Sequence, residues 1–168
     1  ILRLVPEMTR VRFYTLIDHF QSPDLVLGAP AKEIASLRGF DHALARKVLD
    51  APRCVDTDRE LDLMRRHGVR VLTIEDDEYP ENLRQSSFAP PIIFVRGTLQ
   101  ATDRYALAVV GSRQSTQYGR SVAQQFAARL AQCGLTIVSG FASVVDTQAH
   151  EAALRAGGRT LAVLGCGH

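Results

Sequence analysis

Three stretches decide the fold: LAVVGSR (107–113), LTIVSGFA (135–142) and TLAVLGCG (160–167). Each is a short apolar run, rich in β-branched residues, that ends in glycine or small polar residues. This pattern is typical of a buried strand followed by a turn. The three stretches therefore predict three strands whose ends carry small, polar loops.

The segments between these strands have the periodicity of helices, over 118–132 and 147–156. In the first helix, Val122, Phe126 and Leu130 recur at four-residue spacing and are expected to form the buried stripe. The second helix has an inner face made almost entirely of alanine. Buried strands that alternate with helices predict parallel strands joined by right-handed crossovers, which is a Rossmann-like α/β sheet.

In such sheets, ligands bind beyond the carboxyl ends of the strands. The residues at these ends are 111–119, 139–142 and 165–167, and all three segments combine glycine with hydroxyls or a following helix. Glycine lets backbone N–H groups approach a ligand, and a helix N-terminus adds positive potential. The sequence therefore predicts a phosphate-binding edge.

Common cofactor motifs are missing from this edge. A dinucleotide fingerprint would place glycine two and five residues after Gly111, where the chain has Arg113 and Thr116. No glycine is followed by Lys and then Ser or Thr, so a P-loop is excluded as well. We expect no cofactor, and Arg113 has two interpretations: a ligand contact, or an exposed loop arginine that pairs with a nearby carboxylate.

The first 60 residues predict a small all-α domain, with helices over 9–20, 31–37 and 41–49. The sequence LRGF (37–40) resembles the glycine-containing hairpin of SAM-like or helix-hairpin-helix domains; alternatively, the glycine simply ends one helix before the next. A charged helix over 58–67 and strands over 71–74 and 92–95 follow. We expect a helical domain over 1–60 and a Rossmann-like domain, truncated at its C-terminus, over 61–168.

Composition narrows the class of protein further. The net charge of +2 is too small to identify a nucleic-acid binder, although residues 101–168 carry six arginines against three acidic residues. The three cysteines (54, 133 and 166) lie far apart, which argues against disulfides and a zinc site. Without a long apolar run or a signal peptide, we expect a cytoplasmic protein with no membrane contact.

Several motifs recur along the second half of the chain: Val110-Gly-Ser-Arg with Tyr118-Gly119, Ser139-Gly140-x-Ala142, Asp146 with Ala149-His150, and GGRTLAVLGCG (157–167). Together they resemble the DprA family, also called Smf, the DNA-processing proteins of bacterial transformation. Upstream, YPENL (79–83), Pro90-Pro91 and FVRG (94–97) are similar to the segment that precedes the Rossmann-like fold in that family. The match covers nearly the whole chain.

The resemblance implies a protein without catalysis that binds single-stranded DNA at the strand ends and hands it to the RecA recombinase. It also implies a homodimer in the full-length protein. In that family the arginine of Gly-Ser-Arg lies in the DNA pocket, which carries over to Arg113. The DNA-phosphate-binding residues are expected to be Gly111, Ser112, Arg113, Ser139, Gly140, Gly165 and Gly167.

The chain departs from the family pattern in two places. It stops at His168, whereas the family continues through the rest of the sheet and the dimer contacts. Val144 stands where the family usually has glycine, and a β-branched residue resists positive φ. The second loop is therefore expected to be reshaped.

Three residues have side chains capable of other chemistry. Asp146 and His150 are four residues apart on a helix and invite an acid/base role, but we expect Asp146 to be the helix N-cap and His150 to pack or hydrogen-bond under a loop. Cys166 is expected to be a small residue at a crowded strand end rather than a nucleophile.

Two further functions are alternatives to DNA binding. One is a nucleotide-hydrolysing enzyme of the lysine-decarboxylase-like Rossmann group, although its Pro-Gly-Gly-x-Gly-Thr loop is missing from the sequence. The other is a protein-interaction domain. An interaction domain is discriminated from a DNA-binding domain by whether substitution of Arg113 abolishes DNA binding while leaving partner binding intact.

Overall fold

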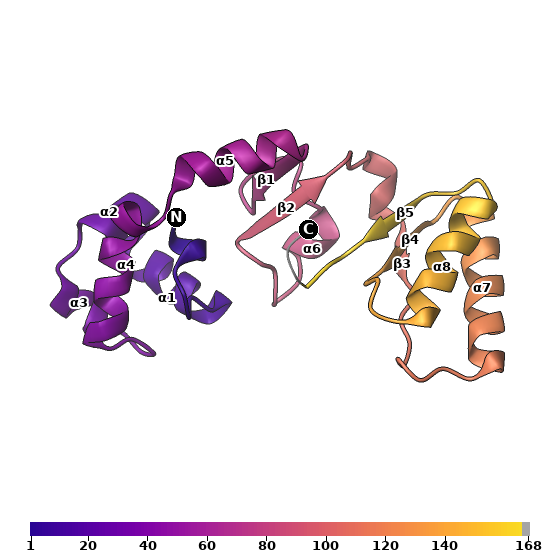
Figure 1. Cartoon of the computed structure of the whole chain (residues 1–168), viewed down its shortest axis with the longest axis horizontal. Coiled ribbons are helices and arrows are strands. Elements are labelled where there is room, and N and C mark those ends of the chain that lie inside the picture. Colours follow the sequence, from indigo (N-terminus) through magenta and orange to yellow (C-terminus); the bar gives the residue numbers. More distant parts are fainter. Residues whose placement is uncertain (166–168) are drawn as a thin grey trace. The chain divides into compact units, whose positions relative to one another are not determined.

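The structure, a computed structural model, describes residues 1–165 of the chain. These residues form two compact units (Figure 1). The helical unit contains Ile1–Tyr79 and Leu83–Thr98, and the Rossmann-like unit contains Pro80–Asn82 and the chain from Leu99 onward. The division expected at residue 60 lies where helices give way to the first strands, and as a domain boundary it remains a prediction.

Helices dominate the first unit, as predicted. They are η1 (Leu2–Leu4), α1 (Arg10–Phe20), α2 (Pro23–Gly28), α3 (Ala31–Ser36), α4 (His42–Cys54) and α5 (Thr57–Arg66). The short helix α2 was not predicted, because Ser22-Pro23 resembles a break. Ser22 is instead the N-cap, whose hydroxyl accepts from Leu25 N at 3.2 Å, and Pro23 occupies the first turn, where its missing N–H costs nothing.

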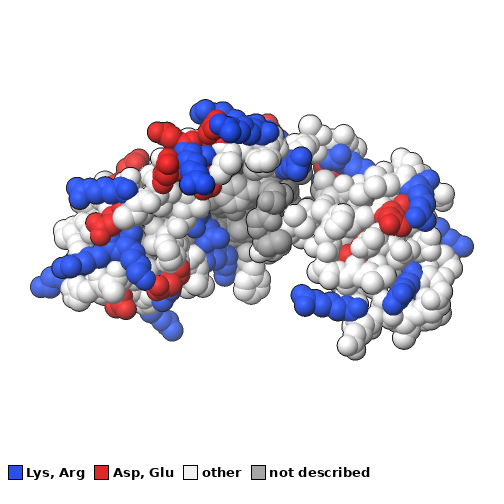
Figure 2. Space-filling model, viewed as in Figure 1, with Lys and Arg blue, Asp and Glu red and all other residues white. Residues whose placement is uncertain are grey.

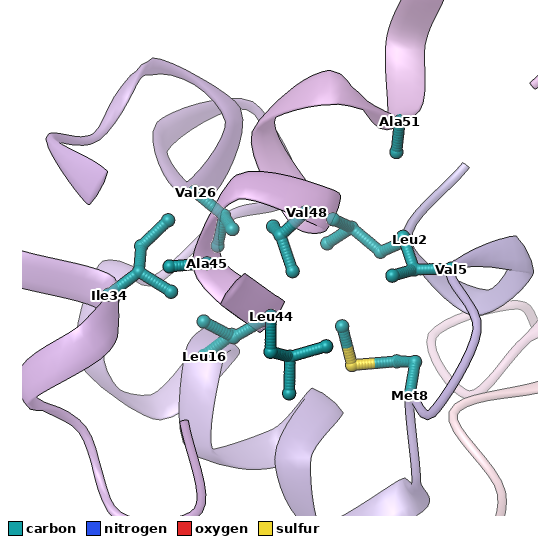
Figure 3. Close-up of a cluster of buried hydrophobic side chains, with 10 residues drawn as sticks. All are labelled: Leu2, Val5, Met8, Leu16, Val26, Ile34, Leu44, Ala45, Val48 and Ala51. Carbon is teal, nitrogen blue, oxygen red and sulfur yellow. The ribbon is translucent and has the colours of Figure 1, made fainter. Parts of the chain in front are cut away.

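The core of the helical unit is built from large aliphatic side chains (Figure 3). Its buried members are Leu2, Val5, Met8, Leu16, Val26, Ile34, Leu44, Ala45, Val48 and Ala51. Leu16, Val26, Ile34 and Val48 are completely inaccessible to solvent. Burying such side chains contributes roughly 1.5–3 kcal/mol each, which is the main stabilisation of this unit.

Two antiparallel strands complete the helical unit: β1 (Val69–Thr73) and β2 (Ile92–Arg96). Both confirm the predicted strands. The connection between them contains the acidic run 75–78, which is exposed, and the short helix α6 (Glu81–Arg84). Tyr79 in this connection is 2% exposed, and its hydroxyl donates to the carbonyl oxygen of Pro90 at 2.7 Å.

The Rossmann-like unit is the predicted parallel sheet. After η2 (Ala101–Arg104), its elements are β3 (Ala106–Ala108), α7 (Gln117–Gln132), β4 (Thr136–Ser139), α8 (Val144–Arg155) and β5 (Thr160–Ala162). The strand order is β3-β4-β5, with parallel pairing throughout. Because successive right-handed crossovers step in one direction across the sheet, α7 and α8 lie side by side on one face (Figure 1).

The interface between α7 and α8 is made of alanine. Ala123, Ala127 and Ala131 are the buried residues of α7, and Ala149, Ala152 and Ala153 are buried in α8. The alanine face predicted for the second helix is thus confirmed. A Cβ on Gly158, in the turn after α8, would lie 2.6 Å from the Cβ of Ala131, so the helices pack too closely for a larger residue there.

The buried stripe predicted for α7 is wrong. Phe126 is 62% exposed, and Val122 and Leu130 are only partly buried. The three side chains instead line an open groove of about 640 Å³ beside Leu107 and Val110 of the β3 segment. The reason is that α8 presents small residues, and α7 turns its own small residues towards them to allow the close approach.

Charged side chains are distributed unevenly between the units. On the face shown in Figure 2 they are dense over the helical unit and sparse over the Rossmann-like unit.

Among the described residues, no helix is both long and apolar enough to cross a membrane.

Candidate functional site

The structure brings the predicted loops to one edge of the sheet. Because β3, β4 and β5 are parallel, the segments that follow them emerge from the same edge. The loops entering α7 and α8 lie at the same end of these helices (Figure 1). We call this edge, formed by residues 109–116, 139–143 and 163–165, the strand-end edge.

The first loop is held by hydroxyl groups. Thr116 is the N-cap of α7, and its Oγ1 accepts from Gly119 N at 3.1 Å. Ser112 Oγ accepts from Gln114 N at 3.2 Å. The Arg120 guanidinium donates to Oγ and O of Ser115, at 3.1 and 3.2 Å, which ties the loop to the first turn of α7.

Arg113 is exposed in this loop. It makes no hydrogen bond or ion pair with any residue in 1–165, so the alternative that it pairs with a nearby carboxylate is not observed. The guanidinium is a planar, permanently charged donor. It is therefore available for an anionic ligand at the strand-end edge.

Glycine at position 111 is required by packing. A Cβ there would lie 2.8 Å from both methyl carbons of Val145, in the first turn of α8. A Cβ at Gly140 would instead meet only ordinary contacts, 3.6 Å from Asp146 Oδ2 and from the carbonyl oxygen of Val163. The first loop thus rests against α8, and Gly140 lies against the segment that follows β5.

Ser139 lies at the end of β4 and is 2% exposed. Its hydroxyl donates to the carbonyl oxygen of Val109 at 2.6 Å, which links the ends of β4 and β3. In this structure Ser139 therefore fixes the relative position of two strand ends, and its hydroxyl does not face solvent.

The second loop is organised by Asp146, although not in the predicted way. The N-cap of α8 is Ser143, and the helix begins at Val144, three residues earlier than expected. The buried carboxylate of Asp146 accepts from Ala142 N at 2.8 Å and from Ser143 Oγ at 2.9 Å. Burial by itself raises the pKa of this carboxyl, but the hydrogen bonds outweigh burial and hold the pKa below its usual value.

The expectation for Val144 is also corrected. Val144 is the first residue of α8 and has no positive φ. The residue with left-handed backbone in this loop is Phe141, with φ 57°. A β-branched residue is therefore accommodated at 144 without strain.

His150 lies beneath the second loop, as predicted, and is 4% exposed. Its Nδ1 lies 2.6 Å from Thr160 Oγ1, and that hydroxyl donates to the carbonyl oxygen of Ile137 at 2.8 Å. Because the hydroxyl proton is committed, we assign the imidazole proton to Nδ1. Burial lowers the pKa of His150, with the Asp146 charge acting in the opposite direction, so the ring is neutral at pH 7.

Few residues of the third loop can be described. Gly165 is exposed at the strand-end edge. Gly167 and Cys166, together with His168, lie outside the described residues.

One conspicuous arginine does not belong to the site. Arg159 Nε lies 2.5 Å from Asp103 Oδ1, and its second nitrogen lies 2.8 Å from Oδ2, which makes a two-pronged ion pair. Thr136 Oγ1 donates to the same carboxylate at 2.9 Å. The hydrogen bonds from Arg159 lower the pKa of Asp103. This group ties the amino-terminal ends of β4 and β5 to η2.

The strand-end edge can hold an anion. The N-termini of α7 and α8, helices of 16 and 12 residues, both begin there and supply positive potential. Arg113 adds an exposed positive charge. No cluster of side chains suited to a metal ion occurs among residues 1–165.

Sequence reasoning missed two contributors to this edge. Arg120 looked like one of several surface arginines, and only its five-residue spacing from Ser115 could have suggested a brace. Phe141 is 59% exposed and stacks on His150, with ring centroids 4.6 Å apart and an interplanar angle of 26°. The signal available was an aromatic residue directly after Ser-Gly at a strand end.

A parallel sheet with exposed Arg113 and two helix N-termini at one edge defines a Rossmann-like protein whose strand-end edge has the chemistry suited to an anion. Comparison with known proteins then gives the family. The model of the DNA recombination-mediator protein A family matches residues 70–168. The chain belongs to this family, which confirms the resemblance to DprA and Smf.

Individual relatives agree with this assignment. Protein Smf of Synechocystis is 29% identical over 90% of this chain and 39% of its own length. The putative DNA processing protein DprA of Mycobacterium tuberculosis is 37% identical over 75% of this chain and 34% of its own length. The chain thus spans between a third and two fifths of the length of these relatives.

A solved structure is similar as well. The X-ray structure of DNA processing protein A from Streptococcus pneumoniae matches with a TM-score of 0.70 and 26% identity. The match covers 96% of this chain and 54% of that one. The Rossmann-like fold is therefore shared with a family member.

Proposed function

We propose that the protein binds single-stranded DNA through its phosphate backbone at the strand-end edge, without catalysis. Arg113 is the observation that carries this proposal, because it is exposed and has no partner within residues 1–165. It lies in the loop that enters α7 and that packs, through Gly111, against the first turn of α8. The other contributors are the exposed residues Ser112 and Gly165 and the partly buried Gly140. Membership of a family of DNA recombination mediators supports a nucleic-acid ligand over a small nucleotide.

The wider role follows from the same family. Relatives are named DNA processing proteins, and the family a recombination mediator. We propose that the whole protein passes the bound strand to the RecA recombinase and acts as a homodimer. A strand held by its phosphates is bound with little sequence preference, which suits a step that must act on any incoming DNA.

Fluorescence anisotropy with a labelled oligo-dT strand tests this function. The whole protein is titrated at two salt concentrations, with duplex of equal length for comparison. We expect tight, salt-sensitive binding to the single strand. Arg113→Ala should weaken it about tenfold to a hundredfold, as expected for loss of a charge-assisted contact, and reduce the salt slope by about one.

The matched control is Arg129→Ala. Arg129 is an exposed arginine in the last turn of α7, at the opposite end of the helix from the strand-end edge. It should retain the wild-type affinity. Absence of binding at low salt, or equal losses for both variants, would refute the proposal and favour a small nucleotide as the ligand.

A further inference from the structure

Phe141 has an unusual combination of properties. It is an aromatic residue with left-handed backbone, φ 57°, a conformation that bulky side chains rarely adopt. Its side chain is nevertheless 59% exposed, so the conformation does not serve to bury it. Strain of this kind persists where the surrounding structure enforces it, and it gathers at ligand-binding positions.

The backbone on either side of Phe141 is fixed. Ala142 N donates to the Asp146 carboxylate, which also binds Ser143, and Ser139 is anchored to the end of β3. These bonds hold the residues flanking position 141 from both directions. The loop therefore presents the ring at a fixed place on the strand-end edge.

The orientation of the ring is fixed as well. One face stacks on the imidazole of His150, a buried group that is itself held by Thr160. This contact covers one side of the phenyl ring, and the exposed surface belongs to the remainder of the side chain. A ligand would find a flat apolar surface whose conformational freedom has already been lost, which reduces the entropic cost of binding.

The surroundings indicate what kind of ligand fits this surface. Phe141 directly follows Gly140, and the loop that carries Arg113 packs against the same helix, α8, through Gly111 and Val145. A cationic, N–H-rich edge next to an exposed aromatic ring suits a ligand that is anionic along one side and aromatic along the other. Single-stranded nucleic acid has this composition.

We propose that Phe141 is a stacking platform for one base of the single strand, with His150 as the support beneath it. This inference rests on the proposed function, since it adds a base contact to a phosphate contact. Stacking is tolerant of sequence because every base has a π face. The site would therefore distinguish strands with bases from strands without them.

A comparison of two strands separates stacking from phosphate binding. Oligo-dT and an abasic strand of equal length carry the same phosphates, and both are titrated against the whole protein. We expect Phe141→Ala to weaken binding of oligo-dT about tenfold, the effect of losing one stacked base, and to leave the abasic strand unchanged. Phe141→Tyr should retain the wild-type affinity for both.

Two control variants distinguish a failure of the stacking proposal from a failure of the proposed DNA-binding function. Phe88→Ala removes another exposed aromatic ring, in the helical unit, and should not alter the preference for oligo-dT. Arg113→Ala should weaken binding of both strands alike. If the wild type binds both strands and Phe141→Ala behaves like it, the stacking proposal alone fails; if the wild type binds neither, the proposed function fails as well.

A fluorescence measurement provides an independent test that does not depend on the alanine variant folding normally. The 168 residues contain no tryptophan. Phe141→Trp therefore adds an indole at the platform, and its emission, measured as the difference from the parent protein, should be quenched by oligo-dT and not by the abasic strand. Equal quenching by both strands, or by neither, would overturn the proposal.

Discussion

The two units of this protein are packed with different side chains. The helical unit surrounds Leu16, Val26 and Ile34 with other large aliphatic residues, whereas the Rossmann-like unit joins its two helices through alanine. Large side chains fill space and tolerate some rearrangement; an alanine interface sets a short, fixed distance between helix axes. The difference indicates that the second unit is built to position the N-termini of α7 and α8.

The difference in packing between the two units predicts that the largest loss of stability follows truncation of Leu16, in the core of the helical unit. Leu16→Ala leaves a cavity among large neighbours and should lower the free energy of unfolding by about 2–5 kcal/mol. Hydrogen exchange should show the loss in residues 1–55 and not in α7 or α8. Leu25→Ala, the same change at a side chain that is 60% exposed, is the control and should have little effect. A similar loss in both units would show that they unfold as one.

Replacing a small buried residue by a larger one should destabilise the Rossmann-like unit more than the helical unit. Ala127 is completely buried between α7 and α8, and Ala127→Leu should destabilise the Rossmann-like unit by about 1–3 kcal/mol, because the helices must separate. Gln125→Leu adds the same side chain at an exposed position of α7 and serves as the control. Urea unfolding with hydrogen exchange measures both. A stabilised Ala127→Leu variant would mean that the interface has spare room.

A smaller effect is expected at the ion pair between Asp103 and Arg159. Hydrogen bonds from Arg159 lower the folded-state pKa of Asp103, so the pair contributes stability above the unfolded pKa of about 3.9 and loses it as the pH falls through the folded value. Asp103→Asn should therefore cost about 1–2 kcal/mol at pH 7 and progressively less below pH 4.

Urea unfolding at pH 7 and pH 3 measures this dependence. The control is Asp62→Asn, which breaks the exposed pair with Arg66 on α5 and should change stability by less than about 0.5 kcal/mol. An equal cost of Asp103→Asn at both pH values would contradict the assigned pKa direction.

The order of strands and helices in the Rossmann-like unit could be predicted because each strand lies in a continuous apolar run with a glycine or serine at its end. Of the three strands that we expected to be buried, only β4 is; β3 and β5 are partly exposed. The buried face of α7 could not be predicted in the same way. Val122, Phe126 and Leu130 have the same spacing as Ala123, Ala127 and Ala131, one residue further on. Only the partner helix decides which stripe is buried, and a single sequence does not specify that partner.

The site was predictable to a similar extent. Parallel strands place their ends together, so the three loops could be located. Arg113 is exposed and has no partner among residues 1–165, and its role as a ligand contact stays a prediction. The conformation of Phe141 was not foreseeable, since no propensity favours positive φ at an aromatic residue. The start of α8 was misplaced because Ser143 and Asp146 are both good capping residues, and the backbone contact to Ala142 distinguishes them only in three dimensions.

The bond between Asp146 and Ala142 N has a consequence for how this loop varies. The carboxylate accepts from the main-chain N–H of Ala142, so this contact does not use the side chain of Phe141. Residue 141 can therefore be replaced while this backbone contact is kept. A photo-crosslinking phenylalanine analogue installed there would keep the ring where Phe141 has it and record which part of a bound molecule passes over it.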